Sequence, residues 1–176
     1  MNLSQYFLKS KFLDQALIHR SYLNEHTDAQ GSNERLEFLG DAVLELVITQ
    51  HLYQHFPDKS EGQLTALRSA LVKTQTLGQV ANGLGVGELL KMSHGEEISG
   101  GRTNTSLLAN TLEAIIGALY LDQGLPQAQK FIEAHLASLL PTIISQKLYQ
   151  DFKSILQETV QAQGLTAPRY RIIRTL

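Results

Sequence analysis

The sequence predicts an all-α protein, and three observations carry that prediction. Apolar residues recur at the three- and four-residue spacing of a helix through most of the chain. No convincing alternating, strand-like run occurs before residue 169. The 176 residues are 43% apolar and 18% charged, which provides for a hydrophobic core and excludes a disordered chain.

Helix-breaking residues set the expected boundaries in the first half of the chain. A helix is expected over residues 11–24, followed by a polar loop over 28–32. Asn33 is expected to cap a second helix that continues to Phe56 and ends at Pro57. Ser60 is expected to cap a third helix, whose apolar positions continue to Leu84.

The second half repeats the alternation of helices and breakers. Residues 93–105 contain three glycines and almost no apolar side chains, so we expect an exposed loop there. An apolar helix is expected over 106–121, with a break at 124–126. A further amphipathic helix follows and is interrupted at Pro141.

The C-terminal segment 147–176 differs in charge and pattern from the rest. Residues 1–146 carry a formal net charge of −5, whereas 147–176 carry +3. A helix is expected over 151–163 and a strand over 169–174, and one strand cannot form a sheet alone. The segment therefore predicts the opening of a second domain. Its basic charge is typical of a nucleic-acid-binding end, although ordinary surface scatter is the alternative.

Composition excludes several classes of protein. The chain has no cysteine, which excludes disulfide frameworks, thiolate metal sites and cysteine nucleophiles. It has no secretory signal pattern at the start, and no apolar run approaches the roughly 18 residues that a membrane span needs. We therefore expect a cytoplasmic protein with no membrane partner.

The predicted helix 33–56 carries carboxylates within a largely apolar surface. Glu34, Glu37, Asp41 and Glu45 fall within an arc of about 80° when placed on a helix. Unpaired carboxylates in a half-buried site cost on the order of a few kcal/mol each, and a bound divalent cation removes that cost. The alternative is a solvated acidic face, but the flanking apolar residues favour a cleft.

A second helix presents matching oxygen atoms. Asn110 and Glu113 share one side of the predicted helix 106–121, and Gly117 on that side allows another helix to approach closely. Oxygen ligands from two helices are the arrangement that a hard cation such as Mg²⁺ prefers. Such short spacings also arise by chance, so spacing alone leaves both interpretations open.

The run Glu34–Leu44 (ERLEFLGDAVL) resembles the signature of the ribonuclease III family, the double-stranded-RNA endonucleases. Segments 16–22, 61–69, 100–102 and 108–122 resemble further parts of that family in the same order. Residues 151–158 and 170–172 resemble the first helix and first strand of a double-stranded-RNA-binding domain. The resemblance implies an all-α endonuclease domain over 1–146 and an incomplete α/β RNA-binding domain over 147–176.

The resemblance also implies an activity and a set of metal ligands. It implies cleavage of double-stranded RNA in rRNA and mRNA precursor processing, with 5′-phosphate and 3′-hydroxyl products. Glu37, Asn110 and Glu113 match the positions of Mg²⁺ ligands, with Mn²⁺ as a substitute metal. Asp41 and Glu113 match catalytic acids.

Two further residues are implicated in assembly by the same resemblance. Phe38 matches an aromatic residue at a homodimer contact, and Glu61 matches an acid near the dimer groove whose role stays open. In this family two subunits form a groove that holds the RNA duplex.

One ligand position departs from the family pattern. The family usually has Asp where this chain has Asn110, and the amide keeps an oxygen but loses the charge, so weaker metal binding is expected. The alternative to an enzyme is a catalytically weakened ribonuclease III-like RNA-binding or assembly protein. A second alternative, an unrelated all-α hydrolase of small phosphoesters, is disfavoured by Phe38 and by the segment 147–176.

Several basic side chains have ordinary interpretations as well as functional ones. His19 could touch nucleic acid, but a hydrogen-bonded structural role is favoured. Arg68, Lys73 and Arg102 are expected to be solvated charges rather than phosphate contacts.

Overall fold

The computed structural model describes residues 3–29, 31–149, 156–157 and 160–170. Within these ranges the chain is helical, and its β-structure is limited to an isolated parallel bridge between Ile18 and Lys91. The all-α prediction is therefore confirmed for this part of the chain. The elements in chain order are η1 (Leu3–Tyr6), α1 (Ser10–Ala16), η2 (Arg20–Asn24), α2 (Glu34–His55), α3 (Glu61–Val72), α4 (Thr74–Gly83), α5 (Val86–Leu89), α6 (His94–Ile98), η3 (Gly101–Thr103), α7 (Thr105–Gln123), α8 (Leu125–His135), η4 (Ala137–Leu139) and α9 (Leu140–Ser145).

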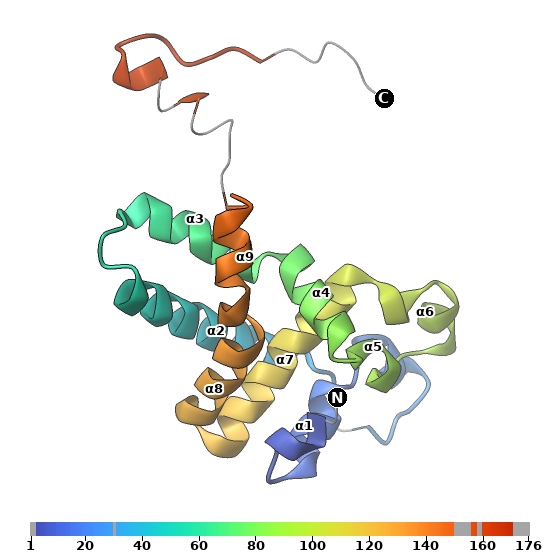
Figure 1. The fold of residues 1–176 in the computed structure, drawn as a ribbon. Helices are drawn as coiled ribbons and strands as arrows, with labels where there is room; N and C mark the ends of the chain where they lie inside the picture. The colour runs from blue at the N-terminus through green and yellow to red at the C-terminus, as the bar shows by residue number, and fades with distance from the viewer. Residues whose placement is uncertain (1–2, 30, 150–155, 158–159, 171–176) are drawn as a thin grey trace.

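Helix α7 forms the centre of the fold (Figure 1). Helices α1, α2, α4 and α8 all pack against it, and its apolar side chains are buried on nearly every side. A helix that is apolar all round is stable only when neighbours cover it on all sides, which is what these helices do. No helix in the described ranges is long and apolar enough to cross a membrane.

Helices α2 and α7 make the most extensive helix contact, and two glycines permit it. A Cβ atom on Gly40 of α2 would overlap the carbonyl group of Glu113, and a Cβ atom on Gly117 of α7 would overlap the carbonyl oxygen of Leu36. The backbones therefore touch without intervening side chains. This confirms the close approach that Gly117 predicts.

One predicted helix cap is confirmed and the other is wrong. Ser60 forms a capping box with Gln63 at the start of α3. Asn33 makes no cap hydrogen bond to α2. Instead, its buried side-chain amide donates to the carbonyl of Ala16 at 3.2 Å, and its backbone N–H donates to the carbonyl of Ile18 at 2.8 Å. Asn33 thus fastens the start of α2 to the end of α1.

Two predicted helices are interrupted in the structure. The helix predicted over 11–24 ends at Ala16, because Ile18 pairs with Lys91 and the chain restarts as the short 3₁₀ helix η2. The helix predicted from Ser60 to Leu84 is broken at Lys73. Its extended backbone (φ −63°, ψ 146°) separates α3 from α4. The Thr76 hydroxyl donates to the carbonyl of Ala70 at 2.8 Å and fixes this corner.

The later boundaries follow the same pattern of partial agreement. The predicted helix 106–121 is confirmed as α7, but the expected loop 93–105 contains the short helix α6, capped by Ser93. Of the predicted helix 151–163, residues 156–157 and 160–162 are helical in the structure. Residues 151–155 and 158–159, and most of the predicted strand 169–174, lie outside the described residues.

The close crossing predicts a large cost for one added methyl group. Gly117→Ala should lower the free energy of unfolding by about 2–3 kcal/mol, because its Cβ has no space against Leu36. Gly83→Ala is the matched control, since nothing lies within 4 Å of its Cβ, and it should be neutral or slightly stabilising. Urea unfolding of both variants measures the difference, and equal stabilities would contradict this account of the crossing.

Candidate active site

A cavity of about 760 Å³ lies where α2 and α7 meet the segments around η2 and α6. It is mainly acidic, and its walls come from four parts of the chain that are far apart in sequence. The lining residues are His19, Arg20, Asn33, Glu34, Glu37, Phe38, Asp41, Glu96, Leu107, Asn110, Thr111 and Glu113.

The cavity brings together four of the residues that the sequence singles out. Glu37 and Asp41 reach it from α2, and Asn110 and Glu113 reach it from α7. Glu61 does not, since it lines a separate cavity of about 260 Å³ formed with residues of α2 and α3. The predicted grouping of two helices around one acidic site therefore has a geometric basis, while the role of each residue stays a prediction.

The glycine crossing explains why these side chains meet. Glu37 lies one turn before Gly40 on α2, and Glu113 lies one turn before Gly117 on α7, so the closest point of the two backbones sits beside the two carboxylates. The start of α7 is fixed by Asn104, whose side-chain oxygen accepts hydrogen bonds from two backbone N–H groups at 2.9 and 3.1 Å.

Burial and mutual repulsion disfavour ionised carboxylates in this cavity. The pKa of Glu113 is raised to about 7 by burial first, and then by the charges of Asp41, Glu37 and Glu45. The pKa of Glu37 is raised by burial and then by Glu34 and Asp41. No ion pair among the described residues offsets these effects at Glu37 or Glu113.

The donor atoms suit a hard cation in type and charge. The cavity lining includes the carboxylates of Glu37, Asp41 and Glu113 and the amide of Asn110, and a divalent cation would relieve the repulsion that raises the pKa of Glu37 and Glu113. In the described residues, no three His, Asp or Glu side chains are arranged as a ready-made metal-binding group.

Six lining residues were not predicted as part of the site, and two of them are Asn33 and Leu107. Thr111 is buried and donates its hydroxyl to the carbonyl of Leu107 at 2.7 Å. Glu96 comes from α6, in the expected loop, where no local pattern marks it. His19 and Arg20 lie at the start of η2, which interrupts a predicted helix, and only the resemblance over 16–22 drew attention to them.

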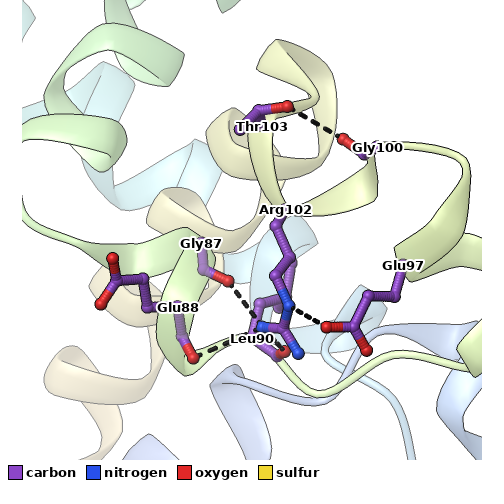
Figure 2. Close-up of polar contacts among 7 residues, drawn as sticks. All are labelled: Gly87, Glu88, Leu90, Glu97, Gly100, Arg102 and Thr103. Atoms are coloured by element: carbon purple, nitrogen blue, oxygen red, sulfur yellow. Dashed lines mark hydrogen bonds and ion pairs between the residues drawn. The ribbon is translucent and has the colours of Figure 1, made fainter.

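Arg102 holds the segment that carries Glu96. Its guanidinium donates from Nη1 to the carbonyls of Gly87 (2.9 Å), Leu90 (3.1 Å) and Glu88 (3.4 Å), and from Nε to Glu97 (2.6 Å), as Figure 2 shows. The prediction of a solvated charge is wrong for this residue. Its donors instead satisfy the carbonyl groups around the end of α5.

Phe38 projects from α2 at the edge of the cavity. Its side chain is 82% exposed, which is unusual for a large apolar group. Other exposed residues continue along the same face of α2 at helical spacing, so Phe38 begins a mostly apolar stripe in which Thr49 is polar. The further members are Ala42, Leu46, Thr49 and Tyr53.

A family model described as Ribonuclease-III-like matches residues 9–140. The chain belongs to the ribonuclease III family. It is 49% identical over 170 residues to ribonuclease 3 of Geobacillus kaustophilus, and the aligned region covers 95% of this chain and 68% of that protein. It is 43% identical over 166 residues to ribonuclease 3 of Treponema denticola, and the aligned region covers 94% of this chain and 68% of that protein. The predicted enzyme class, an endoribonuclease of the ribonuclease III type, is confirmed.

Solved structures agree with the assignment. The nuclease domain of ribonuclease III from Campylobacter jejuni matches with a TM-score of 0.68 and 40% identity, over 76% of this chain and 95% of that one. That protein has a flexible region involved in dimer formation. Dicer from Pichia stipitis matches with a TM-score of 0.56 and 27% identity, over 96% and 74% of the two chains. The all-α ribonuclease III nuclease fold is thus confirmed.

The raised pKa of Glu113 predicts a pH dependence of stability. In metal-free buffer, the free energy of unfolding should fall as pH rises from 4.5, the ordinary pKa, to about 7, because the folded state retains a proton that the unfolded chain releases. Glu113→Gln removes this titration, so the variant should gain stability relative to the wild type across that interval. Thermal unfolding against pH measures it, and parallel curves would contradict the assigned pKa.

Proposed function

We propose that this chain is a Mg²⁺-dependent endoribonuclease that cleaves double-stranded RNA, leaving 5′-phosphate and 3′-hydroxyl ends. The processing of rRNA and mRNA precursors is the corresponding biological role. The observation that carries the proposal is the single cavity that unites the carboxylates of α2 with Asn110 and Glu113 of α7 in a ribonuclease III-family chain. The cytoplasmic location expected from the sequence stays a prediction.

In this proposal each polar side chain has a distinct task. Glu37, Asn110 and Glu113 hold a Mg²⁺ ion, for which Mn²⁺ can substitute, through their side-chain oxygens. When bound, the ion supplies Lewis acidity to a water molecule and to the phosphate oxygens. Asp41 acts as the catalytic acid beside them.

Glu113 has a second task, which is to exchange a proton. Its raised pKa means that the carboxyl is about half protonated near neutral pH, and it must release that proton to act as an anionic ligand. The proposal therefore couples metal binding to proton release at a Glu113 oxygen. At limiting Mg²⁺ the cleavage rate should therefore increase as pH rises through about 7 and level off above it, where Glu113 is already ionised.

The face of α2 supports assembly as a homodimer. An exposed aromatic beside a site is costly for a monomer, and Phe38 begins a stripe that runs along α2 to Tyr53. We propose that this stripe packs against its counterpart in a second subunit, and that the two cavities then face one RNA duplex. Glu61, in its separate cavity beside this stripe, is assigned to the same dimer region.

The domain division follows the family match. We propose that residues 1–146 form the nuclease domain and that 147–176 begin a double-stranded-RNA-binding domain. The match over 9–140 lies wholly inside the first of these, and the change from −5 to +3 in formal charge falls between them. Duplex RNA is bound mostly through its phosphates and 2′-hydroxyl groups, which suits the basic segment.

A second candidate function is favoured by one observation. Asn110 lines the cavity where the family usually has a carboxylate, and this reduces the charge available to hold a cation. A chain that binds RNA but cleaves it weakly, as an assembly protein, is consistent with that loss. The intact carboxylates at 37, 41 and 113 favour the enzyme instead.

Cleavage of a long RNA duplex by the purified chain distinguishes the two functions. The wild type should cleave with Mg²⁺, and Glu113→Gln should reduce the rate by at least about 100-fold, since it removes a charged ligand. Glu88→Gln is the matched control, because Glu88 is exposed and lies outside the cavity. In the same assay, Asn110→Asp should lower the Mg²⁺ concentration for half-maximal rate. Binding without Mg²⁺-dependent cleavage by the wild type would instead support the assembly protein.

The dimer proposal predicts the effect of a charge on α2. Phe38→Glu should give a monomer in sedimentation experiments, because the carboxylate would be buried against the second subunit. Ile98→Glu is the control, since Ile98 is 73% exposed on α6 and lies outside the stripe. A wild-type chain that sediments as a monomer at high concentration would contradict the proposal.

A further inference from the structure

The cavity has few positive charges for a site that must accept a polyanion. Five carboxylates line it, and Arg20 is the one Lys or Arg among its described lining residues. A cation held by Glu37 and Glu113 would not neutralise the negative charge of Glu34, which lines the same cavity. Any phosphate group that enters beside the cation therefore needs a donor on the wall formed by residues 19 and 20.

Arg20 is available to change partners. Its Nη1 lies 3.6 Å from a carboxylate oxygen of Glu34, and the two side chains are 73% and 56% exposed. An ion pair of this length and exposure contributes little, because water screens it. Glu34 also accepts a hydrogen bond from the Ser32 hydroxyl at 2.9 Å, so it keeps a partner when Arg20 moves.

His19 supplies a second donor next to Arg20. Its Nδ1 accepts a hydrogen bond from the backbone N–H of Ser21 at 3.3 Å and lies 2.8 Å from the Ser21 hydroxyl. Because a backbone N–H can only donate, this network assigns Nδ1 as the unprotonated nitrogen of the neutral ring. The proton then lies on Nε2 of a side chain that lines the cavity.

The backbone that carries these two residues is firmly held. The N–H of His19 donates to the carbonyl of Lys91 at 2.9 Å, and the N–H of Lys91 donates to the carbonyl of Leu17 at 2.8 Å. The Ser21 hydroxyl also accepts a hydrogen bond from the N–H of Ser93 at 3.0 Å. The donors are thus presented from a fixed support, which is what a binding site for a charged group requires.

Two other arginines of the fold, Arg102 and Arg68, have partners elsewhere. Arg102 donates to three carbonyl groups and to Glu97 (Figure 2). Arg68 pairs with Glu45 at 3.1 Å and donates to the Thr49 hydroxyl. Neither lines the cavity, so neither can offset its charge locally.

We propose that Arg20, together with the Nε2–H of His19, forms a phosphate-binding subsite at the edge of the cavity. The subsite holds a backbone phosphate next to the one that is cleaved, and Arg20 exchanges Glu34 for that phosphate when RNA binds. This inference rests on the proposed function, since it takes duplex RNA as the ligand. It makes Arg20 a binding residue rather than a catalytic one.

Single-turnover cleavage of a short RNA duplex at saturating Mg²⁺ and several salt concentrations tests the subsite. Arg20→Gln should raise the RNA concentration for half-maximal rate roughly tenfold and reduce the slope of log affinity against log salt by about one, as expected for one lost phosphate contact. The rate at saturating RNA should stay within about twofold. Arg20→Lys should restore the salt slope, because the charge is kept.

Arg35→Gln is the matched control, since Arg35 is an exposed arginine on α2 that does not line the cavity. Equal effects of Arg20→Gln and Arg35→Gln on affinity and salt slope would overturn the subsite, as would a fall in the saturated rate with unchanged affinity. If the wild type does not cleave, the proposed function is wrong. Fluorescence anisotropy of the labelled duplex with the same variants then still decides whether Arg20 binds phosphate.

Discussion

The contact between the backbones of α2 and α7 is the constraint on which the rest of the structure depends. At Gly40 and Gly117 each helix lies directly against a carbonyl group of the other, at Glu113 and Leu36. A contact this close fixes both the separation of the two helices and their rotation, because any larger residue would force them apart. The carboxylates of α2 and the Asn110–Glu113 pair of α7 therefore face one cavity as a consequence of packing.

Local sequence patterns predicted the features that are determined locally. Periodicity predicted the buried helix α7, Ser60 as a helix cap predicted the start of α3, and a glycine on the face of Glu113 indicated the helix crossing. The failures arise from hydrogen bonds between segments distant in sequence. Asn is a residue type that often caps helices, but the Asn33 side chain donates its hydrogen bond to the carbonyl of Ala16 instead. The pairing of Ile18 with Lys91 ends the first helix earlier than its apolar periodicity predicts.

The same distinction applies to the candidate site. The acidic arc on α2 and the Asn110–Glu113 pair could be predicted because helical geometry converts spacing into direction. Glu96 and Arg20 come from short elements whose position depends on long-range contacts, such as those that Arg102 makes with the end of α5. The resemblance to ribonuclease III identified the family, but it did not place His19 and Arg20 in the lining of the cavity.

The order of synthesis gives the crossing a further consequence. On the ribosome, α2 emerges before α7, so the face of α2 that packs against α7 has no partner until α7 follows, whereas the face that contacts α3 is covered earlier. The cavity therefore forms only after α7 has been synthesised, because its walls include residues of both helices. An interrupted translation product that stops before α7 cannot assemble the cavity.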